Sequence, residues 1–224
     1  MIRKRPTFDL QAAFNASYGS WNTQRYEADV SSPFTQDGKV RGRVFGYQQT
    51  GDSYLDRYEL EKNGIGAVLE ADVTDTTLLT AGYTETNHKP NGVNWGSNPL
   101  INTEGEQLSY SRSYNYSPDW TYWNNNIKSY FAELEQKLAG DWTAKLTYDE
   151  KRTKRDSKLL FLSGKPGANG TSGITLYPGM YIDDNKEQQA SLSFSGTYPL
   201  WGQRHEASLG YVWAKNSLDE LGYA

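Results

Sequence analysis

A period-two alternation of apolar and polar residues recurs along this chain and limits its possible folds more than any other feature. The first run has apolar residues at alternate positions: Phe8, Leu10, Ala12, Phe14, Ala16 and Tyr18. The residues between them are polar or small: Asp9, Gln11, Ala13, Asn15, Ser17 and Gly19. Because successive side chains of a strand point to opposite faces, one face of this strand is apolar and the other polar. A strand that separates lipid from water has this pattern.

Eight further runs of the same kind follow, so the sequence predicts an all-β, antiparallel protein of nine strands. These runs include Tyr26, Val40, Ile65, Leu79, Tyr130, Trp142, Ala190 and Ala207. The run that starts at Val40 is less regular, because Phe45 and Tyr47 take the parity of the polar residues. This change of parity predicts a β-bulge.

The connections between the predicted strands alternate in length. Tight turns are expected around Asp37, Asp75, Gly140 and Gly202, and longer loops after the third, fifth and seventh strands. The fifth connection is expected from about residue 88 to residue 126. Short turns at one edge and long loops at the other are typical of outer-membrane barrels. A soluble β-sandwich or small barrel is the alternative, since lipid and a protein core favour the same side chains.

Composition excludes several classes of protein. The chain has 224 residues, a net charge of −4 and no cysteine, and its mean hydropathy is −0.80. No run of about 18 apolar residues is present, so a transmembrane helix is not expected. A barrel keeps a low mean hydropathy because half of each strand faces a polar lumen. The acidic balance gives no indication of nucleic-acid binding, which requires clustered positive charge.

Several segments resemble TonB-dependent siderophore receptors. Residues 2–7 (Ile-Arg-Lys-Arg-Pro-Thr) are similar to the segment where these receptors pass from the plug domain into the barrel. Residues 36–43 (Gln-Asp-Gly-Lys-Val-Arg-Gly-Arg) resemble their first periplasmic turn and third strand. Residues 201–206 (Trp-Gly-Gln-Arg-His-Glu) resemble a later turn. The resemblance covers essentially the whole chain and is strongest to receptors for ferric hydroxamate siderophores such as coprogen and rhodotorulic acid, followed by pyoverdine receptors.

The resemblance implies a domain organisation, a location and partners. It implies that residues 1–6 end a plug domain or linker, and that residues 7–224 form the N-terminal part of a plugged barrel of about 22 strands. Nine strands are then a fragment, which fits the even strand numbers of closed bacterial barrels. The implied location is the outer membrane of a Gram-negative bacterium. The implied partners are a ferric siderophore, the surrounding lipid and the energy-transducing TonB protein, which would be engaged through the missing plug region. No protein-bound cofactor is implied, because iron arrives already wrapped by the siderophore.

The fifth connection contains the candidate binding residues. It holds seven aromatic residues: Trp95, Tyr110, Tyr114, Tyr116, Trp120, Tyr122 and Trp123. Aromatic rings bury apolar ligand surface while their polar atoms form hydrogen bonds. The alternative is that they pack the loop onto itself or form an interfacial girdle. Within the resemblance, Trp95, Trp120 and Tyr122 belong to loop motifs near the ligand pocket, and these three residues are the predicted substrate-binding set.

No catalytic or metal site is expected. The two histidines, His88 and His205, have no second histidine or cysteine at ligand spacing. Glu133 and Glu135 share a strand face, as a hydrated lumen wall would show. A passive porin, an outer-membrane enzyme and a soluble carbohydrate-binding sandwich are the rival functions. A basic run at residues 151–155, expected at the outer end of the seventh strand, is either a contact for lipopolysaccharide phosphates or a solvated loop stem.

Overall fold

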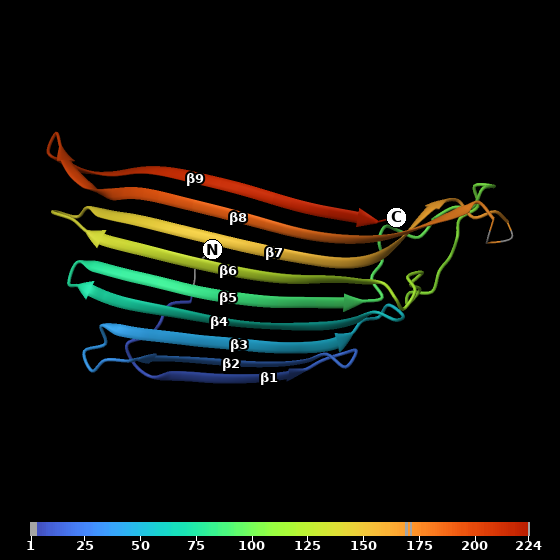
Figure 1. Cartoon of the computed structure of the whole chain (residues 1–224), viewed down its shortest axis with the longest axis horizontal. Coiled ribbons are helices and arrows are strands. Elements are labelled where there is room, and N and C mark those ends of the chain that lie inside the picture. The colour runs from blue at the N-terminus through green and yellow to red at the C-terminus, as the bar shows by residue number, and fades with distance from the viewer. Residues whose placement is uncertain (1–3, 169, 171, 224) are drawn as a thin grey trace.

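The computed structural model describes residues 4–168, 170 and 172–223, and these form a single antiparallel sheet. The strands lie side by side in chain order, from β1 at one edge to β9 at the other (Figure 1). They are β1 (Gln11–Tyr18), β2 (Gln24–Pro33), β3 (Val40–Asp52), β4 (Glu59–Thr74), β5 (Thr77–Asn91), β6 (Tyr122–Lys137), β7 (Thr143–Gly164), β8 (Ile174–Leu200) and β9 (Gln203–Tyr223). The predicted nine-stranded, all-β architecture is therefore confirmed. In the described part of the chain, no helix has the length and apolar character needed to cross a membrane.

The ends of the strands form two opposite edges of the sheet, and the connections at these two edges differ in length. Turns between β2 and β3, β4 and β5, β6 and β7, and β8 and β9 lie at one side, here called the tight-turn edge (Figure 1). At Trp201 and Gly202 both φ angles are positive, 52° and 75°, as a two-residue hairpin turn requires. Residues 53–58, 92–121 and 165–173 connect strands at the opposite side, the long-loop edge. The fifth connection is shorter than expected, because β5 and β6 extend further than their apolar alternation does.

Burial in this sheet is inverted relative to a water-soluble protein. Leu134 and Leu146, which pair directly across β6 and β7, are both exposed. Glu70 and Arg41, which pair across β3 and β4, are almost completely buried on the other face. Soluble proteins bury their large apolar side chains and keep charges at the surface. We call the apolar face the outer face and the polar face the inner face, and their chemistry favours a lipid-facing wall over a soluble sandwich.

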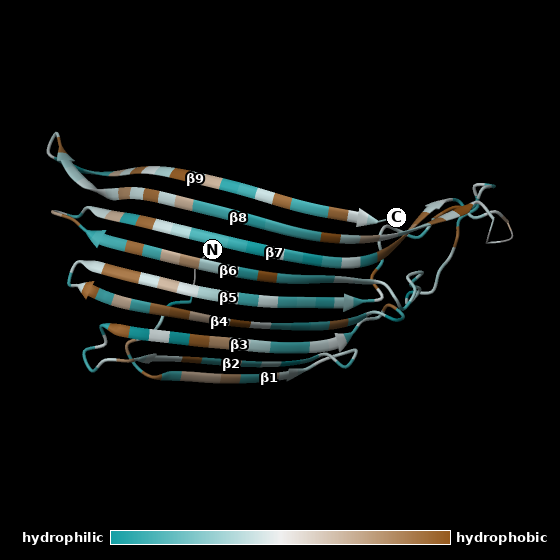
Figure 2. Cartoon of the chain, in the orientation of Figure 1, coloured by the Kyte–Doolittle hydropathy of each residue, from teal (hydrophilic) through white to brown (hydrophobic). Residues whose placement is uncertain are grey.

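Hydropathy also changes along the strands. Figure 2 shows that apolar residues gather toward the tight-turn edge, whereas the stretches of β5 to β7 nearer the long loops are mainly hydrophilic. Strand β8, at 27 residues, is far longer than the roughly 9–11 residues needed to cross a bilayer. The β7–β8 hairpin therefore extends well past the apolar band at the long-loop edge.

The predicted bulge in β3 is wrong. Strand β3 pairs with β2 and β4 in continuous register from Val40 to Asp52. Phe45 and Tyr47 lie on the inner face and cover two glycines of β4, Gly66 and Gly64, which stand directly opposite them. Glycine leaves room for a ring on the facing strand, so these two aromatic side chains can point to the polar inner face without a bulge. The register shift of this sheet lies instead between residues 72 and 74, beside the β4–β5 turn.

The position expected for the basic run is also wrong. Residues 151–155 lie in the middle of β7, because this strand continues to Gly164. Strand alternation then separates the run, with Lys151 and Arg155 on the inner face and Arg152 and Lys154 on the outer face.

Candidate functional site: the loops at the long-loop edge

Two loops that are distant in the sequence are joined into one unit at the long-loop edge. The Arg57 side chain donates hydrogen bonds to the backbone carbonyls of Asn115 and Ser117, the latter at 3.0 Å from Nε. The side-chain amide nitrogen of Asn115 donates hydrogen bonds to the backbone carbonyls of Asp56, at 2.7 Å, and Gly92, at 2.8 Å. We call these five residues the loop junction, because they connect residues 53–58 to residues 92–121.

Much of the loop junction is buried although it consists of polar groups: Gly92, Asn115 and Ser117 are buried, whereas Asp56 and Arg57 are exposed. Ser117 and Thr121 are fully buried, and their hydroxyls donate to Asn94 Oδ1 at 2.7 Å and to the Pro118 carbonyl at 2.9 Å. Gly92 has a φ of +62°, and a Cβ on this residue would lie 2.1 Å from the Arg57 carbonyl oxygen. Buried polar groups without partners are costly, so this degree of pairing indicates a preorganised loop rather than a mobile one.

Trp95 joins the same unit to the β7–β8 hairpin. Its ring meets Phe161 of β7 and Tyr181 of β8 edge-on, with centroid distances of 5.8 and 5.3 Å. The Tyr116 hydroxyl donates to the Trp95 carbonyl at 2.7 Å. Burial raises the pKa of the Tyr116 phenol, so this group remains a hydrogen-bond donor at neutral pH. A ligand that reaches Trp95 therefore meets a ring whose orientation is already fixed.

The other two predicted binding residues occupy different environments. Trp120 is 46% exposed at the end of the fifth connection. The Tyr122 hydroxyl donates to Asp156 at 3.1 Å, and strand alternation places Tyr122 on the outer face with Tyr130 and Leu134. The structure thus places Trp95 among aromatic rings, Trp120 in solvent and Tyr122 on the outer wall. Their assignment to ligand binding stays a prediction.

In a second aromatic cluster, the contributions of Trp21 and Tyr54 were not predicted from the sequence. Trp21, in the β1–β2 turn, meets Tyr54 edge-on at 6.3 Å, and the Arg112 guanidinium lies 5.6 Å from the Tyr54 ring centre. Tyr110 and Tyr114 stack beside each other at 4.7 Å. Three connections contribute to this cluster. The sequence did contain one indication of this cluster: Trp21 lies in a tight turn at the same edge of the sheet as the long loops.

Below the loops, the inner face carries charged and amide groups suited to a polar ligand. The Arg155 guanidinium lies 2.6 Å from a buried carboxylate oxygen of Asp183, 3.4 Å from Asn125 Oδ1 and 5.9 Å from the Trp123 ring centre. The second carboxylate oxygen of Asp183 is buried and accepts no hydrogen bond within the described residues. This carboxylate oxygen can accept a hydrogen bond from a ligand hydroxyl or amide that enters from the long-loop edge.

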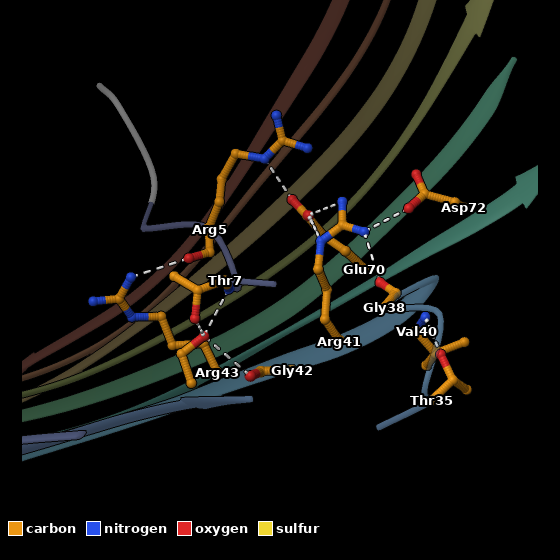
Figure 3. Close-up of polar contacts among 11 residues, drawn as sticks. Arg5, Thr7, Thr35, Gly38, Val40, Arg41, Gly42, Arg43, Glu70 and Asp72 are labelled. Atoms are coloured by element: carbon orange, nitrogen blue, oxygen red, sulfur yellow. Dashed lines mark hydrogen bonds and ion pairs between the residues drawn. The ribbon is translucent and has the colours of Figure 1, made fainter. Parts of the chain in front are cut away.

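A separate ionic cluster lies on the inner face near the tight-turn edge (Figure 3). Glu70, with 1% of its side chain exposed, pairs with Arg5 at 2.5 Å and with Arg41 at 2.7 Å. Arg41 also contacts Asp72 at 2.5 Å. The Glu70 carboxylate raises the pKa of Arg5. These residues, with Arg43, form what we call the basal ionic cluster.

The basal ionic cluster holds the N-terminal segment against the inner face. The Arg43 guanidinium donates to the Arg5 carbonyl at 3.0 Å, and the Thr7 backbone N–H donates to Ser31 Oγ at 2.8 Å (Figure 3). Lys4 pairs with Asp29 at 2.7 Å. The segment preceding β1 is therefore fixed to β2, β3 and β4. Residues 1–3 of the predicted linker lie outside the described residues.

A cavity of about 860 Å³ lies against the inner face between this segment and β9. Lys4, Phe45, Phe131, Lys151 and Glu187 are among its lining residues. Within the described residues, no group of three or more histidine, aspartate or glutamate side chains is arranged to hold a metal ion. The arrangement offers surfaces for binding.

Comparison with known proteins relates this geometry to receptors. No protein-family model matches the chain. A ferric-pyoverdine 358 receptor of Pseudomonas putida is 35% identical over 216 residues, and a ferripyoverdine receptor of Pseudomonas aeruginosa is 31% identical over 212 residues. The matches cover 94% of this chain and 26% of each relative, so the chain spans about a quarter of their length.

Solved structures agree with the sequence matches. The crystal structure of the P. aeruginosa outer-membrane ferripyoverdine receptor, bound to ferripyoverdine, superposes with a TM-score of 0.93 at 30% identity. That match covers 99% of this chain and 29% of the receptor. The relatives are receptors and not enzymes. The chain is thus similar to ferric-siderophore receptors, and its nine strands match part of their barrel.

Proposed function

We propose that this chain forms part of an outer-membrane receptor that takes up ferric siderophores. The observation that carries the proposal is the inverted burial of the sheet, with apolar side chains outside and a charged inner wall, combined with its close superposition on a ferripyoverdine receptor. The loops at the long-loop edge would capture the complex outside the cell. Energy delivered through the TonB partner would then release it inward past the plug.

The cargo class follows from the relatives. Several are receptors for ferric pyoverdines, so ferripyoverdine is the first ligand to test. The coprogen-type hydroxamate expected from the sequence is not supported by these relatives and serves as the comparison ligand. A ferric siderophore presents both ring or alkyl surface and polar edges, which suits the aromatic rings and amide groups of the loops.

The N-terminal segment is proposed as the passage from plug to barrel. The contacts of Arg5 with Glu70 and of Thr7 with Ser31 support this role, because they fix the chain on the inner face where a plug would enter.

Direct binding and uptake measurements with the full-length protein test the proposal. Purified protein should bind ferripyoverdine tightly and in preference to ferric coprogen. Cells that produce it should accumulate iron from the complex only when TonB is present. Uptake that is independent of TonB, together with passage of unrelated small solutes, would instead identify a passive porin.

A further inference from the structure

A row of polar side chains crosses the inner face of the sheet just below the long loops. From β4 to β9 it contains Lys62, His88, Asn125, Arg155, Asp183 and Glu220, each paired with the next across neighbouring strands. Strand alternation puts all six on the inner face. Neighbouring strands lie about 4.8 Å apart, so about 19 Å separates Lys62 from Asp183. The row is therefore polarised, with a cation toward one end and two carboxylates at the other.

Asp183 is a buried carboxylate with one oxygen unpaired. Only 7% of its side chain is exposed, and its Oδ2 lies 2.6 Å from Arg155 Nη1. Its Oδ1 is buried as well and accepts no hydrogen bond within the described residues. Buried polar atoms of native proteins almost always have a partner, so an unpaired one calls for an explanation. The group that would complete it is a hydrogen-bond donor, because an ionised carboxylate only accepts.

Two neighbours of Asp183 supply further acceptors. Asn185 lies two positions along β8 on the same face, about 7 Å away. Its Nδ2 already donates to Glu187 at 3.1 Å, while its buried Oδ1 has no donor in the part of the chain that the structure describes. Glu220 lies directly opposite Asp183 on β9 and is exposed, so a ligand can reach it. We call Asp183, Asn185 and Glu220 the acceptor subsite.

The acceptor subsite lies close to the aromatic rings of the loops. Tyr181 is two positions from Asp183 toward the long-loop edge, on the same face, and its ring meets Trp95 at 5.3 Å. The row that contains Glu70 reaches β8 at Ser191, eight residues from Asp183 and about 27 Å along the strand. The subsite is thus beside the loops proposed to capture the ligand and far from the basal ionic cluster.

We propose that the acceptor subsite binds a protonated amine carried by the ferric siderophore, and so selects siderophores with a free amino group over neutral ones. The inference rests on the proposed receptor function and names a chemical class within its cargo. An ammonium group offers three donors and a positive charge. Three acceptor oxygens match the donors, and Asp183, Glu220 and Arg155 together carry a formal charge of −1. Charge-assisted hydrogen bonds of this kind are the strong ones. Lys62 repels an amine from the opposite end of the row, so the row also orients the ligand.

Two forms of one ligand test the proposal on the full-length protein. They are a ferripyoverdine with a free side-chain amine and the same complex after N-acetylation of that amine. Acetylation removes the positive charge and leaves the iron-binding groups unchanged. The unmodified protein should bind the amine form at least tenfold more tightly than the acetylated form. Equal binding of the two forms would overturn the proposal, and it is also the result expected if a side chain of a preceding plug filled the subsite.

Substitutions on opposite faces of the same two strands locate this discrimination. Asp183→Asn with Glu220→Gln removes both carboxylates of the subsite. The matched control, Asp184→Asn with Asp219→Asn, removes two charges from the adjacent cross-strand pair, which faces outward. The subsite variant should bind the two ligand forms within about twofold of each other, whereas the control should keep the tenfold ratio. A tenfold ratio that persists in the subsite variant would overturn the proposal.

Glu220→Gln alone keeps the test decisive if loss of the buried Asp183 charge prevents folding. Because Glu220 is exposed, this variant should fold and should lower the affinity ratio at least threefold. An unchanged ratio would overturn the proposal. Absolute affinities report separately on the receptor function. Tight and equal binding of both forms would overturn only the subsite, whereas failure of the unmodified protein to bind either form would overturn the receptor function as well.

Discussion

Arg57 and Ser117 are 60 residues apart in the chain, yet the Arg57 Nε lies 3.0 Å from the Ser117 carbonyl oxygen that accepts its hydrogen bond. This contact fixes the fifth connection to the loop between β3 and β4. It therefore sets the positions of the aromatic rings that the two loops present.

Substituting Arg57 with alanine should weaken ferric-siderophore binding by about tenfold. The substitution leaves the buried carbonyls of Asn115 and Ser117 without a donor, a loss of about 1–3 kcal/mol. Binding of ferripyoverdine to the full-length protein measures the effect. Arg204→Ala, which removes an exposed partner of Asp141 at the opposite edge, is the control and should leave affinity unchanged. Equal affinity in all three proteins would show that the loop junction does not position the ligand.

Trp120→Ala and Trp95→Ala should differ in their effects. Trp120 is exposed, so its loss should lower ligand affinity and leave the unfolding temperature unchanged. Trp95 packs on Phe161 and Tyr181, so its loss should lower both. Binding and thermal unfolding, measured on the same preparations, separate the two roles. Unchanged affinity in the Trp120 variant would remove this residue from the binding site.

Glu70→Gln should destabilise the full-length barrel. Glu70 pairs with Arg41 in a site where both side chains are almost fully buried, and breaking such a pair costs about 3–5 kcal/mol. The unfolding temperature, followed by the heat-dependent shift in gel mobility, should fall clearly. Asp75→Asn, which alters an exposed pair with Lys39, should have almost no effect. A Glu70 variant as stable as the Asp75 variant would contradict a structural role for the basal ionic cluster.

Gly66→Ala should destabilise the sheet, and Phe45→Leu should partly restore it. A Cβ on Gly66 would lie 2.4 Å from the Phe45 ring, and overpacking of this kind costs about 1–3 kcal/mol. A smaller side chain at position 45 removes the clash, so the two changes should not be additive. Additive losses of stability would show that the ring does not rest on this glycine.

The strands were predictable wherever one face meets an apolar environment. Residues 142–148 alternate cleanly because their outward members form the apolar band. Further along β7 both faces are polar, so Lys151 and Arg152 look like loop residues although the strand continues to Gly164. Phe45 misled the prediction for a related reason, because its apolar ring lies on the inner face opposite a glycine.

The candidate site was less predictable than the fold. Aromatic residues marked the fifth connection, and Trp95 does lie within a cluster of rings. The contacts of Arg57 could not be predicted, because its partners are backbone carbonyls that any residue can supply. Its φ of +64°, uncommon for a residue other than glycine, is also invisible in the sequence.

Arginine substitutions at two adjacent positions of β7 test most directly whether the outer face meets lipid. Leu146 lies on the outer face and Thr147 on the inner face, so the two variants differ only in which side receives the charge. An arginine facing lipid near the bilayer midplane costs about 2–4 kcal/mol. In the full-length protein, Leu146→Arg should reduce outer-membrane assembly and heat resistance, whereas Thr147→Arg should be tolerated. Equal behaviour of the two variants, or greater damage from Thr147→Arg, would contradict the membrane-barrel account.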